Sequence, residues 1–264
     1  MHCSRAGTLL ALLLSGCATT GTRDWGSQVT WHPSASTLGS AALDAAKSPR
    51  VWIPLAGAAL FQIDNWDHKT SDHLREHTPV FGSESAAQDW SDYLVAASSL
   101  AYVTTVIATP GPDERDLWIR DKAQGLGVGL GAIASTALMT TALKKTTGRT
   151  RPNGESNESF PSGHTSFAAV TTGLARDNLE YLDLGNATHR TLDVGLDALT
   201  VGTAWARVEA GAHFPSDTLF AMALGNFFSQ FWDAAFLEPD TGRGVALNVT
   251  PLDRGVELQW EMRF

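Results

Sequence analysis

The sequence predicts a mainly α-helical protein: a bundle of about six core helices followed by a short C-terminal β-hairpin. Six apolar segments of helical length are rich in Ala, Leu and Gly. The apolar residues change to strict alternation only in the last twenty positions. No repeat with a period of about 20–50 residues occurs, so a repeat protein is excluded. With 43% hydrophobic residues among 264, the chain can bury a substantial core.

The first 17 residues indicate export and lipidation. Arg5 is the only formally charged side chain before an apolar run at 8–14, which is too short to span a bilayer. The run ends in Leu-Ser-Gly-Cys, which resembles a bacterial lipobox, where the cysteine is lipidated and the preceding residues are removed. We therefore expect a signal peptide at 1–16 and a lipid anchor on Cys17. An ordinary secretory signal with an incidental cysteine is the alternative.

The residues after Cys17 suggest a destination and a tether. Ala18 stands where an aspartate would resemble an inner-membrane retention signal, so we expect the periplasmic face of the outer membrane if the source is Gram-negative. Residues 17–38 are polar and aperiodic, as expected of a tether. A helical domain at 39–240 and a hairpin at 241–264 would follow. Cleavage would leave Cys17 as the sole cysteine, so no internal disulfide could form.

Six apolar segments account for the predicted helices, and they occupy residues 51–63, 93–109, 126–143, 165–174, 192–206 and 218–236. The second and third are long enough to raise the question of membrane spanning. Asp193 and Asp197 interrupt the fifth segment, and carboxylates are costly inside lipid. We therefore expect buried core helices rather than an integral membrane protein.

The C-terminal segment alternates like a strand. Apolar residues occupy every second position in two runs, from Val245 to Val249 and from Val256 to Phe264. Turn-forming residues separate the two runs. Two strands cannot close a barrel, so we expect a hairpin that packs on the bundle.

A cluster of positive charge closes the third apolar segment. Between Lys144 and Arg151, eight residues carry four cations and no carboxylate, in a chain whose net charge is −9. Gly148 is a candidate helix C-cap, and Pro152 prevents the helix from continuing. A local positive field attracts an anion. The alternative is a helix C-terminus whose cations merely oppose the helix dipole.

The second block is Phe160-Pro-Ser-Gly-His, which opens the fourth apolar segment. Ser162 is a candidate N-cap, and Gly163 leaves backbone N–H groups accessible at the positive end of a helix. Such a turn suits phosphate oxygens, and His164 could transfer a proton. The alternative is a capped helix with a surface histidine.

The third block contains Arg207, His213 and Asp217. Asp217 falls in the first turn of the next predicted helix, where its carboxylate could bond one imidazole nitrogen and leave the other nucleophilic. Arg207 offers a forked donor for phosphate oxygens. The alternative is a buried His–Asp pair that holds a loop to a helix.

Together the blocks Lys-x6-Arg-Pro, Pro-Ser-Gly-His and Arg-x5-His-x3-Asp resemble the signature of the type 2 phosphatidic acid phosphatase superfamily, which includes lipid phosphatases, bacterial acid phosphatases and vanadium haloperoxidases. The resemblance spans residues 144–217. It implies hydrolysis of phosphomonoesters or diphosphates, lipid phosphates foremost, through a phosphohistidine and without a metal or cofactor. Vanadate would bind as a phosphate mimic.

The resemblance also implies a role for each matching residue. His213 would attack phosphorus, Asp217 would orient His213, and His164 would protonate the leaving group and then activate water. The phosphate-binding residues would be Lys144, Arg151, Ser162, Gly163 and Arg207. The sequence departs from the family pattern at Ala206, where the family usually has Ser. Thr203 could supply the missing hydroxyl, and otherwise the enzyme would be slower because one neutral hydrogen bond contributes about 0.5–1.5 kcal/mol.

Three other readings stay open at this point. A vanadate-dependent haloperoxidase could use the same residues, and a non-catalytic envelope lipoprotein could merely bind anions there. His73-Leu-Arg-Glu-His77 fits an inverted zincin pattern, although a solvated helix face explains it more simply. The acidic composition excludes nucleic acid as a partner. A small-molecule or lipid phosphate and a membrane are the expected partners.

Overall fold

A computed structural model of the chain describes residues 24–237 in full and the backbone of 244–252 and 255–263. Cys17 and the signal segment lie outside the described residues, so lipidation stays a prediction. The described part of the chain is mainly α-helical, as predicted. Its α-helices are α2 (Ala35–Lys47), α3 (Pro49–Leu60), α4 (Trp66–His77), α5 (Glu84–Ala108), α6 (Arg115–Thr147), α7 (Gly163–Leu179), α8 (Asn186–Glu209) and α9 (Pro215–Trp232).

All six predicted apolar segments fall on helices, namely α3 and α5 to α9, but the expected count was too low. The structure adds α2 and α4 within its described residues. Helix α4 was not counted among the core helices because its sequence is almost entirely polar and shows no apolar stripe, although a solvated helix face was expected at 73–77. A short 3₁₀ turn, η1 (Ile63–Asn65), precedes α4, and a π-helical turn, η2 (Asp233–Leu237), follows α9.

The region predicted as a tether contributes to the folded domain. Helix α2 begins at Ala35, inside the predicted tether. Trp25 is only 1% exposed and belongs to the main hydrophobic cluster. Gly125 makes room for it, because a Cβ at that position would lie 2.4 Å from the indole ring. A single anchoring aromatic residue in an aperiodic stretch leaves no periodic signal.

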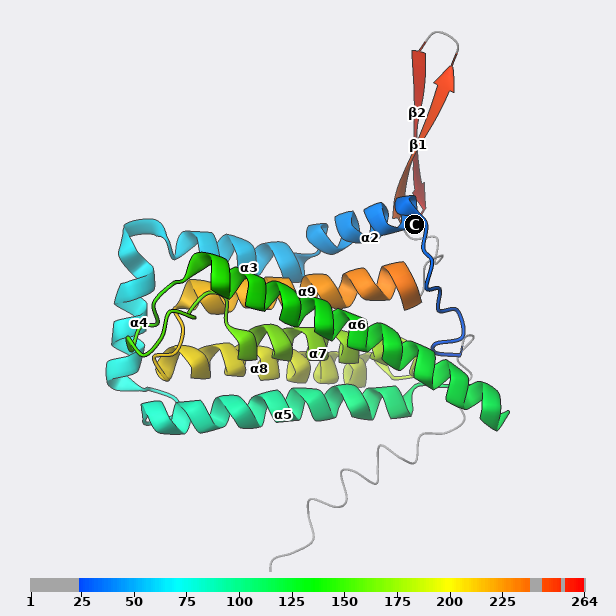
Figure 1. The fold of residues 1–264 in the computed structure, drawn as a ribbon. Helices are drawn as coiled ribbons and strands as arrows, with labels where there is room; N and C mark the ends of the chain where they lie inside the picture. Colours follow the sequence, from blue (N-terminus) through cyan, green and yellow to red (C-terminus); the bar gives the residue numbers. More distant parts are fainter. Residues whose placement is uncertain (1–23, 238–243, 253–254, 264) are drawn as a thin grey trace, which may run out of the picture.

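Helix α7 lies at the centre of the bundle, where it contacts α5, α6, α8 and α9 (Figure 1). Thirteen of its 17 residues are buried, which explains why its sequence has small side chains on all sides. Two glycines allow close contact between α7 and α9. A Cβ at Gly225 would lie 2.5 Å from the Ser166 carbonyl oxygen, and one at Gly173 would lie 2.2 Å from the Ser229 hydroxyl. The central helix pair therefore depends on small residues.

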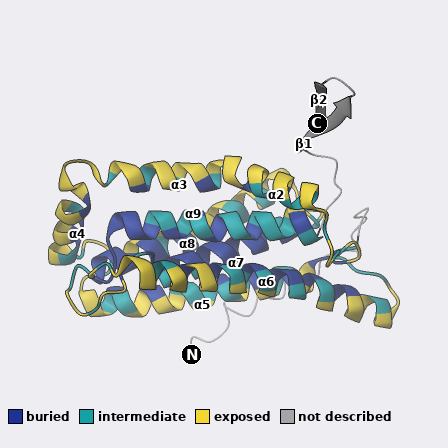
Figure 2. Ribbon diagram, turned by 45° about the horizontal axis from the view of Figure 1, so that its top comes forward, coloured by how far each residue is buried: buried dark blue, intermediate teal, exposed yellow. Residues whose placement is uncertain are grey.

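Helices α5 and α6 are not the buried core helices that we expected. Only 22% of the residues in the apolar window of α5 and 28% of those in α6 are buried. Exposed and half-exposed residues run along α3, α5 and α6 (Figure 2). Large apolar side chains are among them, including Leu100, Val103 and Ile107 on α5 and Leu130 and Leu138 on α6. Both helices are long and apolar enough to cross a membrane.

The carboxylates that argued against membrane contact are paired. Asp193 accepts a hydrogen bond from Arg176 Nε at 2.7 Å, and Asp197 accepts from Arg176 Nη2 at 2.5 Å. Arg50 Nη1 also donates to Asp197, at 3.0 Å. The arginines neutralise both carboxylates, so these residues no longer exclude a bilayer around the bundle.

The C-terminal segment contains two backbone strands, β1 (Gly244–Leu252) and β2 (Gly255–Arg263). They pair antiparallel, with Leu247 opposite Trp260. Their side chains lie outside the described residues. Packing of a hairpin on the bundle therefore stays a prediction.

Candidate active site

The three sequence blocks meet at one end of the bundle. The C-terminal ends of α6 and α8 and the N-terminal ends of α7 and α9 lie there, beside α4 (Figure 1). Two predicted caps are confirmed. Gly148 ends α6 in the left-handed conformation with φ of 54°, and its N–H bonds the Lys144 carbonyl. Ser162 caps α7 by accepting a hydrogen bond from the Thr165 N–H.

His213 is buried, with 1% of its surface exposed. Its Nδ1 lies 2.5 Å from the backbone carbonyl oxygen of Ser159. A carbonyl can only accept a hydrogen bond, so Nδ1 carries the proton and Nε2 keeps a free lone pair. Burial lowers the pKa of His213 well below its ordinary value, and Arg207, Lys144 and Arg151 lower it further. His213 is therefore a neutral imidazole whose Nε2 can act as a nucleophile.

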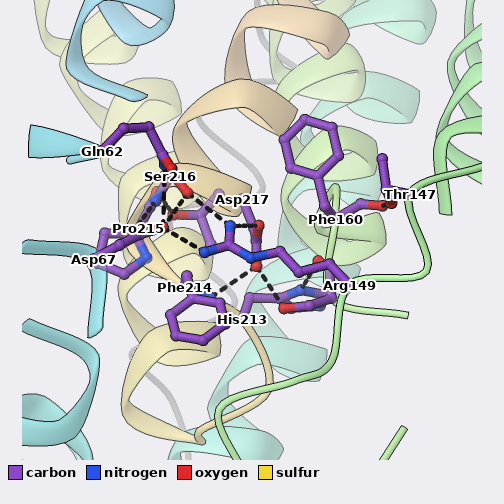
Figure 3. Close-up of polar contacts among 12 residues, drawn as sticks. Gln62, Asp67, Thr147, Arg149, Phe160, His213, Phe214, Pro215, Ser216 and Asp217 are labelled. Carbon is purple, nitrogen blue, oxygen red and sulfur yellow. Dashed lines mark hydrogen bonds and ion pairs between the residues drawn. The ribbon is translucent and has the colours of Figure 1, made fainter. Parts of the chain in front are cut away.

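Asp217 does not bond His213 as we expected. Its Oδ1 accepts a hydrogen bond from Arg149 Nη1 at 2.5 Å, and its Oδ2 accepts from the Ser159 hydroxyl at 2.5 Å and the Phe214 N–H at 2.9 Å (Figure 3). The carboxylate thus caps its own helix, α9, and points toward Arg149. As predicted, one imidazole nitrogen of His213 is hydrogen-bonded and the other is free, but the bonding partner is the Ser159 carbonyl and not Asp217, which contacts Ser159 and Phe214.

Three cations lie within electrostatic range of His213. Lys144, Arg151 and Arg207 all lower its pKa, which places their charges close to the imidazole. Arg207 is 3% exposed, and its own pKa falls to about 10 because of burial and, next, of the neighbouring Arg151. Lys144 Nζ donates to the Glu158 carbonyl. Like charges do not gather in a buried place unless an anion compensates them.

Two of these cations present unused donors. The Nε–H groups of Arg151 and Arg207 are buried and have no hydrogen-bond partner among the described residues. Arg207 Nη1 is held from α5, by the Gln88 side-chain carbonyl and by the Ser91 hydroxyl at 3.2 Å. A buried N–H without an acceptor costs about 1–3 kcal/mol, so an oxyanion that accepts both bonds would be strongly favoured.

His164 is half-buried, with 36% of its side chain exposed. Its Nε2 lies 2.7 Å from Asp92 Oδ1, a partner from α5 that the sequence did not reveal. Burial and then Arg207 lower the pKa of His164, while Asp92 raises it. Arg207 and Arg151 lower the pKa of both histidines, so both imidazoles lie within electrostatic range of the same two guanidinium groups. A half-buried imidazole with a carboxylate partner can transfer protons.

The other residues expected to contact phosphate are Ser162, Gly163 and Thr203, and the structure places them differently. The Ser162 hydroxyl accepts hydrogen bonds from Thr165 Oγ1 at 3.0 Å and from the Thr165 N–H at 3.4 Å, which leaves its own O–H as a donor for a ligand. A Cβ at Gly163 would meet nothing within 4 Å, so open space lies beside the first turn of α7. Thr203 does not replace the hydroxyl missing at Ala206, because its Oγ1 donates to the Leu199 carbonyl at 2.8 Å. The donors available at this edge are therefore backbone amides and the Ser162 O–H.

The zincin-like residues lie elsewhere on α4. His73 and His77 are exposed, with ring centroids 4.3 Å apart, and His77 Nδ1 lies 2.9 Å from the His73 carbonyl. Within residues 24–237, no group of three His, Cys, Asp or Glu side chains is placed to hold a metal ion.

Comparison with known proteins supports the family resemblance of the sequence. A family model described as the PAP2 superfamily matches residues 125–236. A crystal structure of a transmembrane PAP2-type phosphatidylglycerolphosphate phosphatase from Bacillus subtilis shares the fold, with a TM-score of 0.52 and 20% identity. The alignment covers 70% of this chain and 92% of that one. No curated protein sequence matches the chain.

Proposed function

The chain belongs to the PAP2 superfamily through residues 125–236, and from this premise we propose that it is a metal-independent phosphatase acting on phosphomonoesters or diphosphates, lipid phosphates foremost. The observation that carries the proposal is a buried neutral imidazole, His213, near two arginines, Arg151 and Arg207, whose Nε–H groups are buried and unused. A tetrahedral phosphate would satisfy these donors and present its phosphorus to Nε2. The Bacillus subtilis neighbour is a phosphatidylglycerolphosphate phosphatase, so its substrate is a lipid phosphate.

In the proposed first step, the Nε2 lone pair of His213 attacks phosphorus. A P–N bond forms, the bond from phosphorus to the leaving oxygen breaks, and that oxygen takes a proton from His164. Asp92 supports this role because its carboxylate stabilises the protonated form of His164. In the second step His164 removes a proton from water, the water oxygen attacks phosphorus, and the P–N bond breaks to release phosphate and regenerate His213.

Charge stabilisation in both steps is assigned to Lys144, Arg151 and Arg207. Their positive charges are already gathered before the substrate arrives, so no reorganisation is needed as negative charge develops on the phosphoryl oxygens. The open turn at Gly163 adds backbone N–H groups at the positive end of α7. These groups supply what a metal ion supplies in other phosphatases.

One hydrolysis assay distinguishes the phosphatase function from the alternative haloperoxidase and anion-binding functions. Purified full-length protein is offered p-nitrophenyl phosphate and phosphatidic acid in detergent, with and without EDTA. We expect hydrolysis of both, unchanged by EDTA and inhibited by vanadate. Loss of activity in EDTA with recovery in zinc would instead support the site on α4. Halide oxidation that requires added vanadate would support a peroxidase, and the absence of any turnover would support an anion-binding protein.

We further infer that the bundle contacts a bilayer through α5 and α6, in addition to a lipid anchor on Cys17 at the periplasmic face of the outer membrane. The support is the exposed apolar surface of both helices, which a monomeric protein in water rarely leaves uncovered. Exposed Trp90 and Tyr93, whose rings make an edge contact, lie near the site end of α5, where aromatic residues favour a membrane interface. This placement would bring lipid phosphates to the site.

Extraction tests the membrane contact separately from the anchor. The chain is exported behind a cleavable secretory signal that replaces residues 1–17, so that no lipid can be attached. We expect this form to stay in the membrane pellet after an alkaline carbonate wash, because α5 and α6 hold it there. The wild-type chain, labelled with radioactive palmitate on Cys17, is the control. Quantitative release of the unlipidated form would show that the anchor alone holds the protein.

A further inference from the structure

We propose that Asp67 and Arg149 are positioning residues for the nucleophile, because they hold the carbonyl group that orients His213. Together with Ser159, Ser216 and Asp217 they form a hydrogen-bonded network, here called the Arg149 cluster, in which only Arg149 is partly exposed. Figure 3 shows Asp67, Arg149, Ser216 and Asp217 converging. The inference rests on the proposed phosphatase function. Neither Asp67 nor Arg149 was among the site residues expected from the sequence.

Arg149 joins two carboxylates from different helices. Its Nη2 donates to Asp67 Oδ2 at 2.7 Å, and its Nη1 donates to Asp217 Oδ1 at 2.5 Å and to the Ser216 hydroxyl at 2.9 Å. The guanidinium also stacks on the Phe214 ring, 4.1 Å from its centroid. A planar fork suits this arrangement, which a lysine could not reproduce with both carboxylates.

Asp67 belongs to α4 but holds the first turn of α9. It is 3% exposed, its Oδ1 accepts the Ser216 N–H at 2.9 Å, and its Oδ2 accepts the Ser216 hydroxyl. Gln62 Nε2 adds a bond to Oδ2 at 3.3 Å. A carboxylate at the N-terminus of a helix satisfies orphan N–H groups and opposes the helix dipole. Asp67 therefore sets where α9 begins.

Ser159 connects the cluster to His213. Its hydroxyl donates to Asp217 Oδ2 at 2.5 Å, its N–H donates to the Arg149 carbonyl at 2.9 Å, and its own carbonyl accepts His213 Nδ1–H at 2.5 Å. Both the side chain and the backbone of Ser159 are thus tied to the cluster. The direction of its carbonyl, and with it the aim of Nε2, depends on Arg149 and Asp217.

The cluster and the cations have separable effects. The hydrogen bonds of Asp67 and Arg149 reach His213 through Ser159 on its Nδ1 side, and through Asp217 and the neighbouring Phe214 N–H. Arg151 and Arg207 instead present the donors assigned to phosphate. Loss of the cluster should therefore slow the attack on phosphorus while leaving phosphate affinity nearly unchanged. Misplacement of a reacting group by about 1 Å can cost roughly 100-fold in rate. A purely structural role would lower the amount of folded enzyme without slowing each folded molecule.

The test measures single-turnover phosphorylation of Asp67→Asn, with the KM and the vanadate inhibition constant. The matched control is Asp64→Asn, an exposed carboxylate nearby that pairs only with Lys69 among the described contacts. We expect the phosphoenzyme to form about 10- to 100-fold more slowly in Asp67→Asn. This range is typical of residues that orient a reacting group without contacting the substrate. Its vanadate inhibition constant should stay within about threefold of wild type, since its cations are intact, and the control should match wild type.

If Asp67→Asn impairs folding, the same rates are measured for Arg149→Lys. The double variant, Asp67→Asn with Arg149→Lys, is measured as well. Residues that act as one unit give non-additive effects, so the double variant should be about as slow as the slower single variant. Wild-type phosphorylation rates in folded Asp67→Asn, or effects that multiply in the double variant, would overturn the inference while leaving the phosphatase function intact. A wild-type chain that forms no phosphoenzyme would instead overturn the proposed function, and this inference with it.

Discussion

His213→Ala is expected to abolish the phosphoenzyme and to lower kcat by roughly 1,000-fold or more, the scale on which loss of a catalytic nucleophile acts. The loss follows from geometry, because the Ser159 carbonyl fixes the proton on Nδ1 and the lone pair on Nε2. Alanine has no lone pair with which to form the P–N bond. Steady-state hydrolysis of p-nitrophenyl phosphate and acid-labile incorporation of radioactive phosphate measure the two effects.

His73→Ala is the matched control for that experiment. His73 is exposed on α4 and outside the cationic site, so its removal should leave kcat within about twofold of wild type, as expected for surface substitutions. A His213→Ala protein that hydrolyses the ester at the wild-type rate would show that the nucleophile lies elsewhere. Two results together would point to the α4 histidines: an inactive His73→Ala protein, and a wild-type protein that loses activity in EDTA and regains it with zinc.

Arg207→Gln is expected to lower kcat/KM by about 100- to 1,000-fold, the cost of removing one preorganised donor from a buried oxyanion site. Arg207 is 3% exposed, and its Nε–H has no partner among the described residues, so it is ready to bind a phosphoryl oxygen. Glutamine keeps much of the volume and the hydrogen-bonding ability but removes the charge. Initial rates over a range of substrate concentrations separate the change in KM from the change in kcat.

Arg190→Gln provides the control on the same helix, because Arg190 is exposed on α8 and its loss should leave the kinetics unchanged. The vanadate inhibition constant of Arg207→Gln should rise together with KM, since both measure binding of an oxyanion. If Arg207→Gln keeps kcat/KM within about threefold of wild type, Arg207 does not bind phosphate and its unpaired N–H needs another explanation.

Local signals predicted much of this site. The glycine that ends α6 and the serine that caps α7 were recognised because caps depend on one or two neighbouring residues. Spacing also placed Asp217 in the first turn of α9. Its partner was predicted wrongly because a first-turn carboxylate can either cap its own helix or reach a neighbour. The bond from Arg149 holds the Asp217 carboxylate at its own helix and away from His213. The sequence could not single out Arg149, because it is one of four cations in the same block.

Contacts from distant helices gave no such signal. Asp67 and Asp92 lie on α4 and α5, far from the three blocks in sequence, and each is one acidic residue among several on a polar helix face. The exposure of α5 and α6 was missed for a different reason. Apolar composition identifies a helix but does not tell whether protein or lipid covers it. In the sequence, Asp197 indicated that lipid contact was unfavourable. In the structure its charge is paired with Arg50 and Arg176, so this objection no longer holds.

A crystal structure with vanadate bound would test the central claim most directly, because vanadate mimics the phosphoryl group during transfer. The account predicts vanadium within covalent distance of His213 Nε2. It also predicts vanadate oxygens hydrogen-bonded to the Nε–H groups of Arg151 and Arg207, and the Ser159 carbonyl still on Nδ1. Vanadate bound at another surface, or bound between the arginines with His213 Nε2 turned away from vanadium, would contradict it.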